Sequence, residues 1–396
     1  KLREWQRDTL LAITSTAFAF MAAEAMARLL WQPGGQQPVI RVDPVYGWAL
    51  RAGTSLHSVD TDRGLDYRIR VNSLGFRDPD RSVEARSDAR RVLFIGDSMT
   101  FGTGVEVGER CSDQLDARLG PGVEVLNAGV GGWGTDQEFL YLCHEGFDLK
   151  PDAVVLGMCL MNDVINNMLS HEFLGAAPKP RFVLQDGQLV LEPSAARPQP
   201  SSGRKLQRLL KRSRLLHYIG RHVRMLQARF HPRPSPSTAV PYYPEDLESD
   251  TSHWTVFGVP YSPRFENAFR VTEALIETAW DSCRARGIPF ILFAFPQKVE
   301  VDARARMEEL QHHGFDPEWF DLRAPYERLQ RLSERRGFPF VYPLVEFQEM
   351  HAQQPLFFEH DAHPNAAGHA LAAACLEDAV RRGLAGDAVL QAGRAR

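Results

Sequence analysis

The chain has 396 residues, enough for one large domain or two of ordinary size. Hydrophobic residues make up 44% of the chain and charged residues 24%, which is typical of a folded globular protein and not of a disordered one. The formal net charge of −4 lacks the basic excess of a dedicated nucleic-acid binder, so we expect no nucleic-acid partner. The five cysteines form no CxxC pair, which argues against structural zinc and against a disulfide framework.

The N-terminal residues 9–31 form a hydrophobic stretch that is interrupted only by Glu24 and Arg28. As a helix it would be roughly 34 Å long, close to the thickness of a bilayer core of roughly 30 Å. A membrane anchor, a cleaved signal peptide and a buried amphipathic helix compete as interpretations. The flanking Lys1, Arg3 and Arg7 favour an anchor with the bulk of the protein outside the cytoplasm.

Short, continuously apolar runs alternate with helical periodicity in the body of the chain, which predicts an α/β fold with a five-stranded parallel sheet covered on both faces. We expect strands at residues 91–95, 123–129, 153–158, 289–295 and 339–344. We expect helices at about residues 108–119, 134–146, 264–286, 322–336 and 365–382.

We divide the whole chain into segments by composition and by the predicted elements. We distinguish an N-terminal helix (1–31), a linker and β-rich lead-in (32–84), the main domain (85–386) with an insertion (171–262), and a tail (387–396). Within the insertion, the segment from Arg204 to Arg229 carries nine Lys and Arg residues, no acidic residue, and apolar residues at helical spacing. It is either a helix with a solvated basic face or a contact for anionic lipid or an acidic partner.

Four loops carry residues suited to acyl-transfer chemistry. They are Gly-Asp-Ser after the first strand (96–98), Asn-Ala-Gly-Val-Gly-Gly after the second (127–132), Met-Asn-Asp after the third (161–163), and Asp361-Ala-His363 before the last helix. Ligands bind open α/β sheets at the carboxyl ends of their strands, where the first three loops lie. An Asp close to a His can orient the imidazole that deprotonates a Ser. Each motif alone also fits an ordinary cap or turn.

Taken together, the motifs GDSMTFG, NAGVGG, MND and DAHPNAAGH resemble those of the SGNH hydrolase superfamily, the GDSL esterases and lipases. The segment RVNSLGFRD (70–78) also resembles the lead-in of bacterial members with an N-terminal membrane segment. The resemblance covers roughly residues 85–170 and 285–385 and implies a flavodoxin-like three-layer sandwich. The Asp-x-His spacing departs from the usual Asp-x-x-His and resembles the branch that includes polysaccharide O-acetyltransferases.

The resemblance implies a role for each motif residue. Ser98 would be the nucleophile, His363 the general base, and Asp361 the residue that orients His363. The oxyanion hole would consist of the N–H groups of Ser98 and Gly132 and the side chain of Asn162, with Gly131 as the alternative to Gly132. Two further acids, Asp97 and Asp163, are expected to support the site. No metal or cofactor is expected.

Three functions follow as expectations. The first is hydrolysis of an acetyl or short-chain ester through a covalent acyl-serine, by an enzyme anchored through residues 9–31 in a bacterial inner membrane and facing the periplasm. The second is O-acyl transfer to, or deacetylation of, an envelope polysaccharide. The third is a non-catalytic subunit of a membrane complex that keeps the fold. The intact Ser98, Asn162, Asp361 and His363 argue against the third.

Overall fold

The computed structural model describes residues 39–81, 89–170, 178–192 and 253–386, together with single helical positions between residues 6 and 24. The chain divides into two compact units, one of Lys1–Gln37 with Ala196–Ser237 and one of Pro38–Ala195 with Thr238–Arg396. All of the described strands belong to the second unit. The lead-in therefore belongs to the same compact unit as the central sheet.

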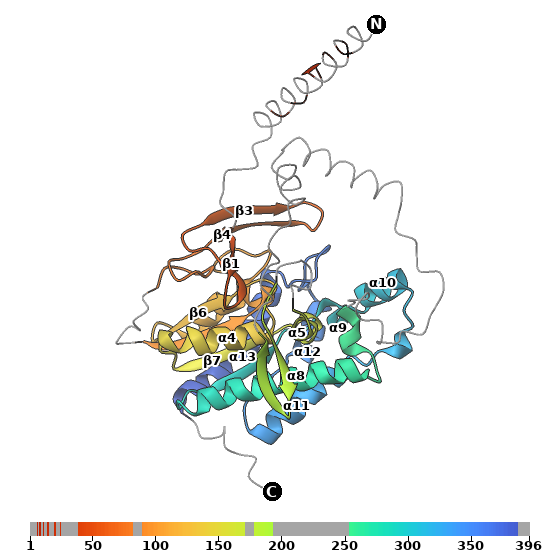
Figure 1. Cartoon of the computed structure of the whole chain (residues 1–396). Helices are drawn as coiled ribbons and strands as arrows, with labels where there is room; N and C mark the ends of the chain where they lie inside the picture. Colours follow the sequence, from red (N-terminus) through yellow and green to blue (C-terminus); the bar gives the residue numbers. More distant parts are fainter. Residues whose placement is uncertain are drawn as a thin grey trace. The chain divides into compact units, whose positions relative to one another are not determined.

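A sheet of five parallel strands forms the centre of this unit, with the order β11-β10-β7-β5-β6 (Figure 1). Its strands are β5 (Arg90–Gly96), β6 (Val123–Gly129), β7 (Ala153–Met158), β10 (Phe290–Ala294) and β11 (Phe340–Val341). Nearly every residue of the three central strands β5, β7 and β10 is buried, as expected for a parallel sheet covered on both faces. The predicted α/β class and the parallel five-stranded sheet are confirmed.

The edge strand β11 is shorter than the predicted run at residues 339–344. It pairs with β10 only at Phe340 and Val341. Pro343, which has no N–H to donate to a ladder, stands at the N-cap of the next helix, α12 (Leu344–His351). The apolar residues after Val341 therefore begin a helix and do not extend the strand.

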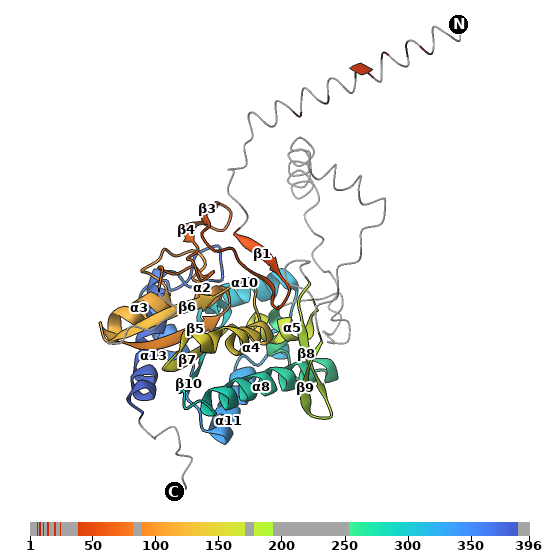
Figure 2. The same ribbon diagram turned by 60° about the vertical axis from the view of Figure 1, so that its left-hand side comes forward.

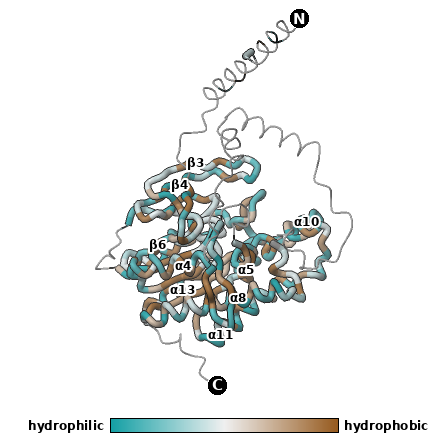
Figure 3. The backbone as a smooth tube through the Cα atoms, viewed as in Figure 1, coloured by the Kyte–Doolittle hydropathy of each residue, from teal (hydrophilic) through white to brown (hydrophobic). Residues whose placement is uncertain are grey.

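Helices cover both faces of the sheet. The main ones are α3 (Cys111–Leu119), α4 (Thr135–His144), α5 (Leu160–Met168), α8 (Pro263–Arg284), α11 (Ala324–Arg336) and α13 (Ala366–Ala385). The first and last of these, α3 and α13, pack against each other, whereas α8 packs against α4, α5 and α11 (Figure 2). Figure 3 shows hydrophobic segments gathered among α4, α8 and α13, where the sheet is buried. This arrangement is the expected three-layer sandwich.

The lead-in folds into two antiparallel hairpins, β1 (Ile40–Asp43) with β2 (Gly47–Leu50) and β3 (Ser55–Asp60) with β4 (Leu65–Arg70). In β4, buried and exposed residues alternate strictly, as the sequence pattern at these positions predicts. Leu65, Tyr67 and Ile69 point into the hydrophobic core, which makes the hairpin part of the main unit.

The insertion holds a third hairpin that the sequence pattern did not indicate, β8 (Arg181–Gln185) with β9 (Gln188–Glu192). The predicted basic helix at residues 204–229 and nearly all of the hydrophobic stretch at 9–31 lie outside the described residues. Among the helices within the described ranges, none is both long enough and apolar enough to span a bilayer.

Candidate active site

Ser98 lies at the point where the central strand β5 ends and the short helix α2 (Ser98–Phe101) begins. The preceding Asp97 caps this helix, since its Oδ1 accepts a hydrogen bond of 2.9 Å from the N–H of Met99. Gly102 ends the helix with a φ of +76°, a conformation that favours glycine. Ser98 is thereby held at the carboxyl edge of the sheet, where such folds bind ligands.

His363 and Asp361 come from the loop before α13 and meet Ser98 at this edge. The Nε2 atom of His363 lies 2.9 Å from the Oγ of Ser98. The Nδ1 atom of His363 lies 2.6 Å from Oδ1 of Asp361, which also accepts a 2.8 Å hydrogen bond from the N–H of His363. The three side chains thus form one continuous hydrogen-bonded chain, the arrangement in which a carboxylate orients an imidazole toward a hydroxyl.

The Asp361 carboxylate is held ionised by its partners. Its side chain is only 3% exposed, and this burial alone would raise its pKa. Hydrogen bonds from His363 and the positive charges of His363 and Arg63 outweigh that effect and lower the pKa to about 2. Asp361 therefore remains a hydrogen-bond acceptor for His363 across the whole pH range in which an imidazole titrates.

The residues expected to form an oxyanion hole border the same pocket as Ser98. Asn162 in α5 and Gly132 in the loop after β6 both line the pocket at Ser98. The Nδ2 atom of Asn162 donates a 2.8 Å hydrogen bond to Oδ2 of Asp97, and its second N–H hydrogen remains for another acceptor. Gly131, the alternative to Gly132, does not line the pocket; its carbonyl accepts a hydrogen bond from Trp48.

The acids expected to support the site are fully buried behind it. Asp97 links the start of α2 to Asn162, and burial raises the pKa of its carboxyl group. Asp163 accepts a 2.8 Å hydrogen bond from the N–H of Cys159 at the start of α5. Burial first, and then the charge of Asp97, raise the pKa of Asp163 well above its ordinary value. Both acids hold the strand-to-helix junctions on which Ser98 and Asn162 stand, and neither lines the pocket.

A pocket of about 440 Å³ opens at Ser98 and His363. Its walls combine apolar side chains with amide and charged groups. They include Arg63, Met99, Met161, Asn166, Gln297, Lys298, Val299 and Glu309. Sequence reasoning missed Arg63, Lys298 and Glu309, because no local pattern distinguishes them from ordinary surface charges. In the part of the chain that the structure describes, no cluster of His, Cys, Asp and Glu side chains could hold a metal ion.

Lys298 fastens the loop that carries the Asp361–His363 pair. It belongs to the short helix α9 (Lys298–Val301), and its Nζ donates hydrogen bonds of 2.7 Å to the carbonyl oxygens of Phe358 and Glu359. A single ammonium group thus holds the backbone of this loop just before Asp361.

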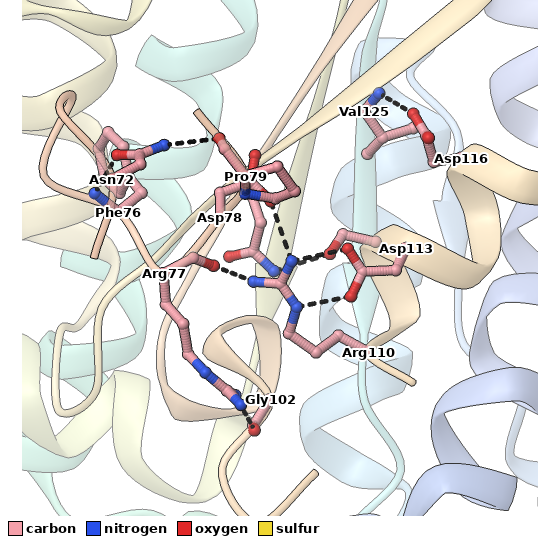
Figure 4. A network of polar contacts seen from close by, with 12 residues as sticks. Asn72, Phe76, Arg77, Asp78, Pro79, Gly102, Arg110, Asp113, Asp116 and Val125 are labelled. Carbon is pink, nitrogen blue, oxygen red and sulfur yellow. Dashed lines mark hydrogen bonds and ion pairs between the residues drawn. The ribbon is translucent and has the colours of Figure 1, made fainter. Parts of the chain in front are cut away.

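The lead-in segment RVNSLGFRD braces the helix that carries Ser98 (Figure 4). Arg77 is fully buried and donates hydrogen bonds to the carbonyl oxygens of Phe101 and Gly102, at 3.2 and 2.7 Å, at the end of α2. Arg110 in turn donates to the carbonyl oxygen of Arg77 and binds Asp78 and Asp113. The lead-in is therefore a structural part of the site.

The protein thus combines a flavodoxin-like three-layer α/β sandwich with a Ser–His–Asp hydrogen-bonded chain at the carboxyl edge of its sheet. The model of the GDSL-like lipase/acylhydrolase family matches residues 94–371. The chain belongs to this family, and it is an enzyme of the ester-hydrolysing class. No curated protein matches it in a sequence search.

Several solved structures are similar to the chain. A member of the lipolytic G-D-S-L family from Veillonella parvula has 12% identity and a TM-score of 0.38, with 74% of this chain and 100% of that chain covered. A GDSL-like lipase from Bacteroides thetaiotaomicron has 12% identity and a TM-score of 0.35, with 76% and 92% covered. An acetylxylan esterase from Geobacillus stearothermophilus has 14% identity and a TM-score of 0.35, with 76% and 96% covered.

Proposed function

We propose that the protein hydrolyses an acetyl or other short-chain ester through a covalent acyl-enzyme on Ser98. The observation that carries the proposal is the hydrogen-bonded chain from Ser98 Oγ through His363 to Asp361, with distances of 2.9 and 2.6 Å. An imidazole that is oriented by a carboxylate and lies within hydrogen-bond reach of a hydroxyl can remove its proton as the hydroxyl attacks a carbonyl.

The reaction divides into two steps. In the first, Ser98 Oγ attacks the ester carbonyl, its proton passes to Nε2 of His363, and that proton then leaves with the alcohol. In the second, His363 deprotonates a water molecule, which attacks the acyl-serine; the bond between the acyl carbon and Ser98 Oγ breaks, the proton passes from His363 to Oγ, and the acid leaves. The N–H groups of Ser98 and Gly132 and the side-chain amide of Asn162 stabilise the oxyanion in both steps. Each such donor contributes about 3 kcal/mol to transition-state stabilisation.

The decisive test is the loss of activity in Ser98→Ala. The purified chain is assayed on p-nitrophenyl esters of increasing acyl length, and the native protein is expected to be fastest on the shortest. The variant should lose at least about 10³-fold in kcat. A Ser98→Ala variant with native kcat on the same ester would contradict the proposal. Mass spectrometry of the native protein, quenched with acid during turnover, is expected to find an acyl group on the peptide that contains Ser98, and Ser98→Ala should show none.

A second candidate function is O-acyl transfer to an envelope polysaccharide, and the Asp-x-His spacing of residues 361 and 363 favours it. Here a sugar hydroxyl would replace water in the second step. Incubation with an acetyl ester in the presence and absence of a sugar acceptor separates the two functions. Hydrolysis alone supports the esterase, whereas acetylated sugar that forms only with the acceptor supports the transferase. A native chain that turns over neither substrate but co-purifies with membrane subunits would support a non-catalytic role.

For the location we propose a single anchor formed by residues 9–31, with the enzyme on the periplasmic side of a bacterial inner membrane. The length of this stretch and the positive charges before it support the proposal. The basic segment 204–229 would then face anionic lipid or an acidic partner. Fractionation of cells that express the full chain, followed by protease treatment of spheroplasts, tests both the anchor and its orientation.

A further inference from the structure

The two carboxylate oxygens of Asp361 have different partners. Oδ1 accepts hydrogen bonds from the ring and the backbone of His363. Oδ2 lies 2.5 Å from Nε of Arg63 and is also in contact with the second terminal nitrogen of the same guanidinium. Arg63 stands 298 positions earlier in the chain, in the turn between β3 and β4, and it lines the pocket. A residue of the lead-in therefore takes part in the active site.

The β3–β4 hairpin is held beside the active-site loop by contacts that do not involve the side chain of Arg63. Gly104 passes so closely between Leu65 of β4 and Phe358 of the loop that a Cβ atom there would lie 3.0 and 2.5 Å from their side chains. The N–H of Arg68 also donates a 3.0 Å hydrogen bond to Glu106. The turn itself is closed by a 3.2 Å hydrogen bond from the N–H of Arg63 to Asp60. Loss of the Arg63 side chain should therefore leave the hairpin in place.

The function of this contact follows from the geometry of the carboxylate. An aspartate can rotate about its side-chain bonds, and rotation would turn Oδ1 away from Nδ1 of His363. Two donors of the Arg63 guanidinium bind Oδ2 and oppose that rotation, because it would break these charge-assisted hydrogen bonds. Lys298 holds the backbone of the same loop but makes no contact with the carboxylate oxygens. Arg63 supplies the constraint on the side chain that Lys298 cannot supply.

We infer that Arg63 is a positioning residue of the catalytic site, which fixes the Asp361 carboxylate so that it orients His363 toward Ser98. This inference rests on the proposed serine-dependent hydrolysis. The β3–β4 hairpin then contributes a side chain to the catalytic site, in addition to preceding the main domain in the chain.

The ion pair also changes the charge beside the general base, because Arg63 partly neutralises the negative charge of Asp361. Other charged or titratable groups near His363 include Asp97 before α2, Cys159, Lys298 in α9 and Glu309 of the pocket wall. They also include His369 of α13, which burial keeps neutral with a pKa of about 3. All of these groups remain when Arg63 is replaced. A change in the activity of the variant therefore reports the loss of the guanidinium alone.

The experiment compares Arg63→Gln, Arg63→Lys and the control Arg68→Gln, an exposed arginine on the same hairpin. The full chain is assayed on the best p-nitrophenyl ester over a range of pH, and thermal melts monitor folding. Arg63→Gln should lower kcat by about 10- to 100-fold with little change in KM, as outer partners of catalytic groups do. Its acid limb in kcat/KM should move to higher pH, since protonation of the base is then favoured. Arg63→Lys should recover part of kcat and keep the native acid limb, and Arg68→Gln should behave as the native protein.

Chemical rescue provides a second readout that a purely structural role would not move. Millimolar methylguanidinium should raise the kcat of Arg63→Ala several-fold and leave Arg68→Gln unchanged. Native kcat in Arg63→Gln, together with an inactive Ser98→Ala, would overturn this inference alone. An equal loss in all Arg63 variants, with no shift of the acid limb and no rescue, would overturn it as well. Full activity in Ser98→Ala would instead overturn the proposed function, and the role of Arg63 would fall with it.

Discussion

Arg77 donates a 2.7 Å hydrogen bond to the carbonyl oxygen of Gly102, the residue that ends the helix carrying Ser98. The same guanidinium reaches the carbonyl oxygens of Arg68 and Val105, so it joins the β3–β4 hairpin to the loop beyond α2. Burial, together with the nearby charge of Arg110, lowers the pKa of Arg77 to about 10, which still leaves it protonated at neutral pH. A single buried cation thus joins the lead-in to α2, the helix that carries Ser98.

Replacement of Arg77 by Met should destabilise the protein and lower its activity. The variant leaves several buried carbonyl oxygens without a donor, each of which costs about 1–3 kcal/mol. We expect the free energy of unfolding, measured with urea, to fall by about 3 kcal/mol or more. The exposed Arg70→Met on the same hairpin should stay within about 0.5 kcal/mol of the native protein. Equal stability of the two variants would show that the buried network does not brace α2.

Replacement of Gly129 by Ala should displace α2, the helix that carries Ser98. A Cβ atom at Gly129 would lie 2.3 Å from the backbone nitrogen of Phe101 and 2.7 Å from the carbonyl carbon of Thr100, so the backbone of α2 itself must move. A shift of about 1 Å in a reacting group can cost about 10²-fold in rate. We expect kcat to fall by at least that factor. Gly122→Ala at the other end of β6, where a Cβ atom would meet nothing within 4 Å, is the control and should keep native kcat.

Replacement of Lys298 by Met should loosen the loop that carries Asp361 and His363. The two carbonyl oxygens at Phe358 and Glu359 lose their ammonium donor, but both can be solvated because the loop lies at the surface. We therefore expect kcat to fall by about 10-fold while the melting temperature changes little. Arg304→Met, an exposed cation at the start of the following helix, serves as the control for loss of charge. A matching loss of kcat in both variants would mean that general electrostatics, not the loop, is responsible.

Glu300 should make the stability of the protein depend on pH. Its carboxylate is buried and accepts hydrogen bonds of 2.7 Å from the hydroxyls of Tyr326 and Tyr342. Burial outweighs these bonds and raises the pKa of Glu300 from 4.5 to about 7. Because the folded-state pKa is the higher one, the fold favours the protonated form. The stabilisation is complete below pH 4.5 and is lost as the pH rises through about 7.

The Glu300→Gln variant tests this dependence, since an amide cannot ionise. A shift of this size corresponds to about 3 kcal/mol between the two limits. Urea unfolding at several pH values between 4.5 and 8 should give a steeper loss of stability with rising pH for the native protein than for the variant. Parallel curves for the two proteins would contradict the assignment.

The parallel sheet and the motif residues could be predicted because their signals are local. A continuous apolar run such as residues 91–95 is typical of a strand buried on both faces, and its end predicts where Ser98 stands. The alternation in β4 likewise indicates one buried face. The shortening of β11 and the β8–β9 hairpin could not be predicted, since both depend on which neighbour a short segment meets in the folded chain.

The α/β class, the sheet strands and the candidates Ser98, Asp361 and His363 can be predicted from local sequence, because hydrophobic period and short motifs are properties of neighbouring residues. The roles of three cations appear only in the folded chain: Arg63 binds the other oxygen of Asp361, Arg77 braces the helix of Ser98, and Lys298 holds the loop of His363. No local pattern indicates the partners of these side chains. Their partners are set by where the β3–β4 hairpin, the segment that follows it and α9 lie in the folded chain, and that placement depends on packing between residues that are distant in the sequence.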